Sequence, residues 1–220
     1  MRKSGEKSKS NFALTASTSN MDIASALGSA GTVVGLVRAV PQLLRLLRAR
    51  EAFGVSLDTA ATSSIVSFGW AAYGIMTGQP YVSFATGSSG IIFALVTFFA
   101  IRYGRSMREF KVAPLWLGIL LAAGIFFGKT GLGIILPISV LVSNIPQLQV
   151  AYKESNLADL SLGTWMLSIT DGLVWGIYSL IQKDFSIMVF AFFQLVTSGS
   201  IVALKLFRAA NRSRYEMEES

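Results

Sequence analysis

The chain has 220 residues, of which 52% are hydrophobic and only 14% charged, whereas about 25% of the residues in a typical soluble domain are charged. It contains neither Cys nor His, which excludes disulfides, zinc sites built from these residues, and catalysis by imidazole. The net charge of +7 is explained more simply by basic cytoplasmic loops than by nucleic-acid binding. Composition therefore predicts an integral membrane protein.

Apolar segments long enough to cross a bilayer, which takes about 20 residues, follow one another along the chain. We predict all-α structure with seven transmembrane helices at 22–44, 58–77, 81–101, 112–128, 131–152, 160–181 and 184–206. Residues 1–21 are expected to be a disordered tail rich in Ser and Lys, and Met21 is an alternative start of the chain. Residues 207–220 are expected to form a polar cytoplasmic tail.

The basic residues predict how the helices are oriented. Most Lys and Arg residues lie in the loops after the first, third and fifth segments and in the C-terminal tail. Because basic loops stay in the cytoplasm, we expect the N-terminus outside and the C-terminus inside, in a multi-pass protein of the plasma membrane.

An internal repeat appears when the sequence is shifted by 105 positions. The matching residues are Pro41-Gln42-Leu43 with Pro146-Gln147-Leu148, Ser56-Leu57 with Ser161-Leu162, Thr59 with Thr164, Trp70 with Trp175, and Tyr73 with Tyr178. Each copy holds three helices, in 22–101 and 131–206, with 112–128 as a linker helix. Three is odd, so the linker helix makes the two copies parallel in the membrane. Parallel repeats of this kind place a binding site between them, near the middle of the bilayer.

The paired Pro-Gln motifs, each followed by a basic loop, a Ser-Leu-x-Thr sequence and a Trp-x-x-Tyr sequence, resemble the PQ-loop family. The arrangement of three, one and three helices resembles its SWEET branch of sugar transporters. The resemblance covers about residues 22–206. It implies a transporter of a small polar solute, sugar-like, whose two three-helix bundles rock to give alternating access.

Four residues at the repeated Pro-Gln motifs are candidate hinges: Pro41, Gln42, Pro146 and Gln147. A proline inside a helix removes a backbone hydrogen bond and loosens the preceding turn. The cytoplasmic ends of the two helices could then swing, although a static kink is the alternative.

Two tryptophans are candidates for the wall of a substrate pocket. Trp70 and Trp175 lie about 12 residues into their helices, or about 18 Å, near the middle of the bilayer rather than at its interfaces. The resemblance implies a Trp against the sugar at this position. It also implies an Asn one helix later, where this chain has Thr86 and Ala191. We therefore expect the substrate to contact Trp70, Trp175, Thr86, Ser89, Gln194, Tyr73, Tyr178 and Asn144.

Asp171 is the clearest ionisable residue inside a predicted membrane helix. Such residues face a cavity or a partner and often mark a transport pathway. Asp171 shares a helix face with Trp175 and Tyr178, so it is a candidate for proton coupling or for binding a cation. The alternative is a structural partner for Arg38 or Asn144.

These features leave two alternatives to a sugar-like transporter. One is a proton-coupled transporter of an amino acid or other cationic metabolite that uses Asp171. The other is a ligand-sensing receptor on the same scaffold. We expect no enzymatic activity, cofactor, metal or nucleic-acid partner, since no catalytic constellation or nucleotide-binding loop is found. The expected partners are a small polar solute and the lipid bilayer, and a homo-oligomer is left open.

Overall fold

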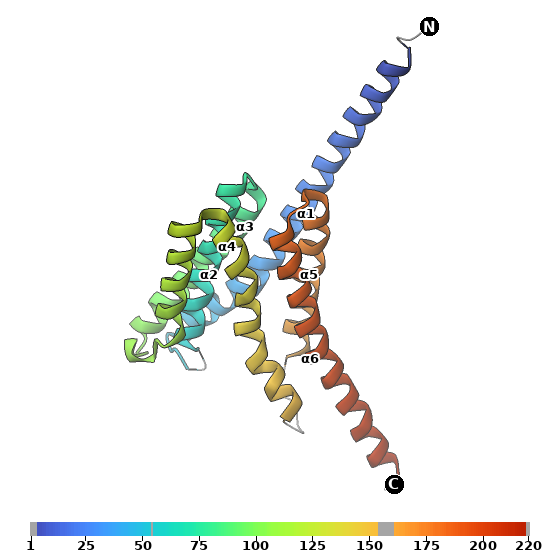
Figure 1. Cartoon of the computed structure of the whole chain (residues 1–220). Helices are drawn as coiled ribbons and strands as arrows, with labels where there is room; N and C mark the ends of the chain where they lie inside the picture. Colours follow the sequence, from blue (N-terminus) through green and yellow to red (C-terminus); the bar gives the residue numbers. More distant parts are fainter. Residues whose placement is uncertain (1–3, 54, 154–160, 219–220) are drawn as a thin grey trace.

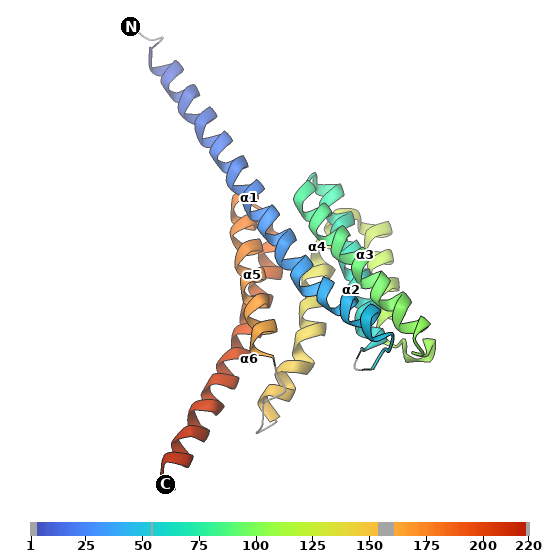
Figure 2. The same ribbon diagram turned by 180° about the vertical axis from the view of Figure 1, so that it is seen from behind.

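The computed structural model describes residues 4–53, 55–153 and 161–218, and these residues contain helices and no strand (Figure 1). The helices are α1 (Ser4–Ala49), α2 (Leu57–Thr77), α3 (Pro80–Arg102), the short 3-10 helix η1 (Met107–Glu109), α4 (Val112–Lys153), α5 (Leu162–Gln182) and α6 (Phe185–Glu218). Helices α1 and α6 carry the two ends of the chain well beyond the bundle (Figures 1 and 2).

Helix α4 consists of two arms that meet at Gly128. This glycine has φ 58° and ψ −141°, a conformation that residues with a Cβ atom rarely adopt. Residues 123 and 131 would lie about 12 Å apart in a straight helix. They are in fact in contact, since a Cβ on Gly131 would collide with the carbonyl oxygen of Ala123. The second arm therefore returns along the first, as Figure 1 shows. The break falls at the predicted boundary between segments 112–128 and 131–152.

Four helical segments of the described chain are long and apolar enough to cross a membrane: Met21–Ala49, Pro80–Arg102, Val112–Ile145 and Phe185–Ala210. Helices α2 and α5 are not among them because they contain several Ser and Thr residues and an Asp each. Many large apolar side chains, including Phe84, Phe98, Ile125, Phe126, Phe127 and Phe192, are more than half exposed. An apolar surface this extensive fits contact with lipid, as expected of a multi-pass membrane protein.

The internal repeat extends to the helix boundaries. Helices α2 and α5 begin 105 positions apart, and so do α3 and α6. Ser56 and Ser161 cap α2 and α5 in the same way, each accepting a hydrogen bond from the backbone N–H three residues later, at 3.3 Å. Such a side-chain acceptor satisfies one of the free N–H groups of a helix start. The repeated Ser-Leu-x-Thr sequence thus fixes equivalent helix starts in the two halves.

The helix pairings follow the same equivalence. In the first half α3 packs on α1 and α2, and in the second half α6 packs on α4 and α5. Between the halves, α1 packs on α5 and α2 packs on α4. These two contacts are equivalent under the 105-residue shift and bring the two halves together around a shared centre.

The described parts of both tails are helical. Residues 4–21 belong to α1 and residues 207–218 belong to α6, so the disorder expected for 1–21 does not hold for its described part. No Pro or Gly lies in 6–27 or in 206–218, and the residues that most strongly stop helices are therefore missing there.

Candidate functional site

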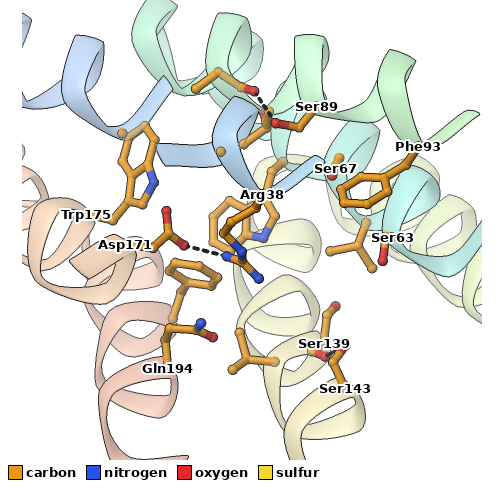
Figure 3. Close-up of a pocket in the computed structure, with 18 of the residues that line it drawn as sticks. Arg38, Ser63, Ser67, Ser89, Phe93, Ser139, Ser143, Asp171, Trp175 and Gln194 are labelled. Atoms are coloured by element: carbon orange, nitrogen blue, oxygen red, sulfur yellow. Dashed lines mark hydrogen bonds and ion pairs between the residues drawn. The ribbon is translucent and has the colours of Figure 1, made fainter. Parts of the chain in front are cut away.

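A cavity of about 200 Å³ lies between the two halves, near the middle of the helices (Figure 3). Its walls come from α1, α2, α3, α4, α5 and α6. The volume is below the range of about 300–1,000 Å³ usual for drug-sized ligands. It therefore suits a small metabolite.

Much of the wall is built from equivalent positions of the two halves. The pairs are Gly35 with Val140, Arg38 with Ser143, Val66 with Asp171, Trp70 with Trp175, Ala85 with Phe190, and Ser89 with Gln194. Because each pair places one residue on each side, the cavity lies on the axis that relates the two halves. The cavity lies where the sequence predicts a binding site, between the repeats, and binding there stays a prediction.

The two tryptophans lie on opposite sides of this cavity, as the repeat predicts. Trp70 and Trp175 are 6% and 7% exposed. Gly31 makes room for Trp175, because a Cβ on Gly31 would lie 2.7 Å from the Trp175 ring. The indole N–H of Trp70 is buried and has no hydrogen-bond partner in the described residues. A solute oxygen in the cavity could accept that hydrogen bond.

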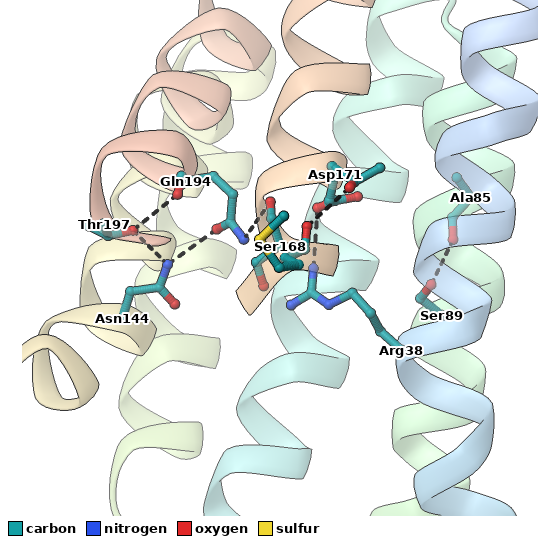
Figure 4. A network of polar contacts seen from close by, with 10 residues as sticks. Arg38, Ala85, Ser89, Asn144, Ser168, Asp171, Gln194 and Thr197 are labelled. Atoms are coloured by element: carbon teal, nitrogen blue, oxygen red, sulfur yellow. Dashed lines mark hydrogen bonds and ion pairs between the residues drawn. The ribbon is translucent and has the colours of Figure 1, made fainter. Parts of the chain in front are cut away.

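Asp171 forms an ion pair with Arg38, which extends across the cavity from α1 (Figures 3 and 4). Arg38 Nη1 donates to Asp171 Oδ2 at 3.2 Å. The Asp171 side chain is 8% exposed and the Arg38 side chain 38%. The sequence offered Arg38 as a structural partner of Asp171, and the structure brings these two residues together in the cavity wall.

Asn144 and Gln194 line the cavity and also connect α4 to α6 (Figure 4). The Asn144 amide donates to Gln194 Oε1 at 3.3 Å and to Thr197 Oγ1 at 2.7 Å. Gln194 Nε2 donates in turn to the backbone carbonyl of Ser168 at 3.5 Å. Ser89, the repeat equivalent of Gln194, donates to the Ala85 carbonyl within α3. Thr86 also reaches the cavity, and its hydroxyl donates to the Val82 carbonyl.

Tyr73 and Tyr178 do not line this cavity, and their predicted contact with substrate stays a prediction. Each tyrosine packs edge-on against its own tryptophan, with ring centroids 5.5 Å apart for Trp70 and Tyr73 and 5.3 Å for Trp175 and Tyr178. Three residues along a helix is nearly one turn, which places the tyrosines nearer the loops after α2 and α5.

Tyr73 takes part in a polar cluster at that end of the molecule. Its hydroxyl donates to the Asp184 carboxylate at 2.9 and 3.0 Å. The Gln79 side-chain amide donates to Asp184 Oδ2 at 2.6 Å, and the backbone N–H of Ile187 donates to Asp184 Oδ1 at 3.0 Å. These bonds join the ends of α2 and α6 across the two halves. Sequence reasoning missed Gln79 and Asp184, although the 105-residue shift pairs them.

The predicted hinge residues give a mixed result. Pro41 and Gln42 lie within α1, which continues as a helix to Ala49. The Pro146 and Gln147 side chains lie outside the residues whose side chains the structure describes. Hinge motion at all four positions stays a prediction.

Fold and site together define an all-helical membrane protein with a central cavity, lined by both apolar and polar side chains, between two related halves. No family model and no curated protein sequence matches this chain. Among solved structures, it is similar to a eukaryotic SWEET transporter, with a TM-score of 0.70 and 16% sequence identity. The match covers 87% of this chain and 99% of that transporter. The chain therefore has a SWEET-like fold.

Proposed function

We propose that this protein is a membrane transporter that moves a small polar, sugar-like solute by alternating access between its two halves. One observation carries the proposal: a cavity between the halves is walled by equivalent residues from both. Two buried tryptophans supply flat apolar surfaces, while Ser89, Gln194 and Thr86 supply polar groups. Apolar walls with a few placed polar groups are typical of small-molecule sites.

In the proposed arrangement, seven helices cross the plasma membrane as two parallel repeats and a linker, with the N-terminus outside. The cluster of Tyr73, Gln79 and Asp184 then closes the outer end of the path. Arg38 and Asn144 lie toward the opposite end, within a turn of the Pro-Gln motifs. The described conformation is thus closed outside. Opening would break the hydrogen bonds to Asp184 while the hinges at Pro41 and Pro146 let the inner ends approach.

Flux measurements test the proposal. The full chain is reconstituted into liposomes, and uptake of radiolabelled glucose and of other small polar solutes is measured. Uptake above that of protein-free liposomes is expected for at least one solute, and Trp70→Ala should abolish it. Arg102→Gln, which changes a basic residue at the end of α3, is the matched control. Binding to the purified protein without net uptake would overturn transport and favour the receptor alternative.

A second candidate is proton-coupled transport, which the position of Asp171 in the cavity wall favours. If the Asp171 carboxylate releases Arg38 and binds a proton in one step of the transport cycle, solute movement is linked to a pH gradient. In that case Asp171→Asn abolishes the dependence of uptake on the gradient. Uptake that remains intact in the variant and keeps its pH response would exclude the coupling.

A further inference from the structure

The charges of the cavity lie on one side of an otherwise paired wall. Within the part of the chain that the structure describes, the charged residues that line the cavity are Arg38 and Asp171. Their repeat equivalents, Ser143 and Val66, also line the cavity and carry no charge. A solute whose two ends differ in charge would therefore meet two different surfaces.

The positive member of the pair is the one that the cavity presents. The Arg38 side chain is 38% exposed, whereas the side chain of its partner Asp171 is 8% exposed. A guanidinium carries five N–H donors and no acceptor. In the described residues, Arg38 makes one hydrogen bond, from Nη1 to Asp171, which leaves the other guanidinium donors available to a ligand in the cavity that Arg38 lines. Figure 3 shows Arg38 in the middle of the lining side chains, with Asp171 to one side.

Other groups in the wall add to this excess of donors. The Trp70 indole N–H can only donate, and it is buried without a partner in the described residues. The hydroxyl of Thr62 is buried without a partner as well. A buried donor left unpaired is costly, and a ligand rich in oxygen acceptors would satisfy these groups.

The geometry points to a solute that carries one carboxylate, bound by the Arg38 guanidinium, with its hydroxyls against Trp70 and Thr62. This inference rests on the proposed function and names the substrate class of the same cavity. A cationic solute is disfavoured because the Asp171 carboxylate is 8% exposed and already pairs with Arg38. A phosphate dianion is disfavoured because the pair of Arg38 and Asp171 is neutral overall, so a dianion would add two uncompensated negative charges to the cavity where a carboxylate adds one. A carboxylate also matches the planar fork of a guanidinium.

Three open-chain solutes with the same carbon frame test the inference: gluconate, sorbitol and glucamine, which are anionic, neutral and cationic. Liposomes that contain the full chain are expected to take up gluconate faster than sorbitol, and glucamine most slowly. Arg38→Gln should reduce the ratio of gluconate to sorbitol uptake about ten- to a hundredfold, as expected for losing a hydrogen bond to a charged group. Asp171→Asn should raise that ratio, because the carboxylate that competes with gluconate is removed.

Two further variants distinguish loss of the carboxylate site from misfolding. Arg38→Gln leaves Asp171 buried without its partner, so the double variant Arg38→Gln/Asp171→Asn, which contains neither charge, is measured as well and should show the same low ratio. Arg105→Gln removes an arginine that pairs with Glu109 at the surface, and it should leave the ratio as in the parent protein.

The outcomes separate this inference from the proposed function. Sorbitol uptake without gluconate uptake, or a ratio that Arg38→Gln leaves unchanged, would overturn the carboxylate site and leave transport standing. Gluconate binding to the detergent-solubilised protein that depends on Arg38, without flux of any of the three solutes, would support the carboxylate site and overturn transport.

Discussion

Gln79 and Asp184 occupy equivalent positions in the two halves, 105 residues apart, and hydrogen-bond directly to each other at 2.6 Å. Two equivalent residues can meet in this way only where the axis that relates the halves passes between them. The same axis passes through the cavity, between Trp70 and Trp175. The contact of Gln79 with Asp184 and the cavity therefore lie along one axis of the molecule.

Loss of the Asp184 carboxylate should open this end of the path. The chain contains no Cys, so a single Cys at Ser89 reports access to the cavity through its reaction with a membrane-impermeant maleimide. Asp184→Ala removes the acceptor of Tyr73 and Gln79. Charge-assisted bonds are worth about 1.5–3 kcal/mol, so labelling from the Asp184 side is expected to rise about tenfold or more.

The controls for this labelling come from the same chain. Asp184→Asn keeps a side-chain oxygen for Tyr73 and should give a smaller increase. Glu109→Ala, an acidic residue paired with Arg105 near η1, should have no effect. Equal labelling rates for the parent and Asp184→Ala would show that the cluster does not close the path.

Asp58 caps the start of α4, and its removal should destabilise the protein. Its carboxylate accepts hydrogen bonds at 2.9–3.1 Å from the backbone N–H groups of Lys111, Val112 and Ala113, at the start of α4. Removing a helix cap costs about 1–2 kcal/mol, which corresponds to about 2–8 °C in Tm for a chain of this size. Asp58→Ala should show this decrease in thermal unfolding in detergent. Asp58→Asn retains one acceptor and should lose less; a Tm unchanged in Asp58→Ala would contradict the capping role.

The sequence predicted the parts of the fold that depend on local pattern and on repetition. The Ser-Leu-x-Thr sequences mark the starts of α2 and α5, and the paired Trp70 and Trp175 locate the cavity. The same shift could have paired Gln79 with Asp184, but the two residues differ in type, so no match in the sequence draws attention to them.

The remaining features depend on contacts between distant segments. Asp58 caps α4 from more than fifty residues away, and its repeat equivalent is Gly163, so neither local pattern nor repetition signals the role. The sequence offered Arg38 as one of several partners for Asp171. The packing of α1 on α5, which brings the two residues together, depends on contacts that the sequence pattern does not show. The tyrosines lie outside the lining of the cavity because sharing a helix face with a tryptophan does not fix the depth at which a side chain lies.

Gly31 is required for the packing of α1 on α5. A Cβ there would lie 2.7 Å from the Trp175 ring, and overpacking of this kind costs about 1–3 kcal/mol. Gly31→Ala should therefore lower Tm and displace Trp175, measured as a change in tryptophan fluorescence. Gly118→Ala is the matched control, because a Cβ at Gly118 meets nothing within 4 Å. The smaller ring of Trp175→Phe should restore part of the Tm lost in Gly31→Ala, and a Gly31→Ala protein as stable as Gly118→Ala would refute the close packing.

Asn144 and Ser143 are neighbours that both line the cavity, yet their hydrogen bonds predict different effects on stability. The Asn144 amide joins α4 to Gln194 and Thr197 on α6, whereas the Ser143 hydroxyl donates to the Ser139 carbonyl within its own helix. Asn144→Ala leaves the buried Gln194 oxygen without this donor, at a cost of about 1–3 kcal/mol.

Thermal unfolding of the two alanine variants measures this difference. Asn144→Ala is expected to lose several degrees in Tm and Ser143→Ala little, because a backbone carbonyl that already accepts its helical hydrogen bond stays satisfied. Similar losses in both variants would show that the contact between α4 and α6 does not depend on this amide. A large loss in Asn144→Ala alone would establish that a residue of the cavity wall also holds the second half together.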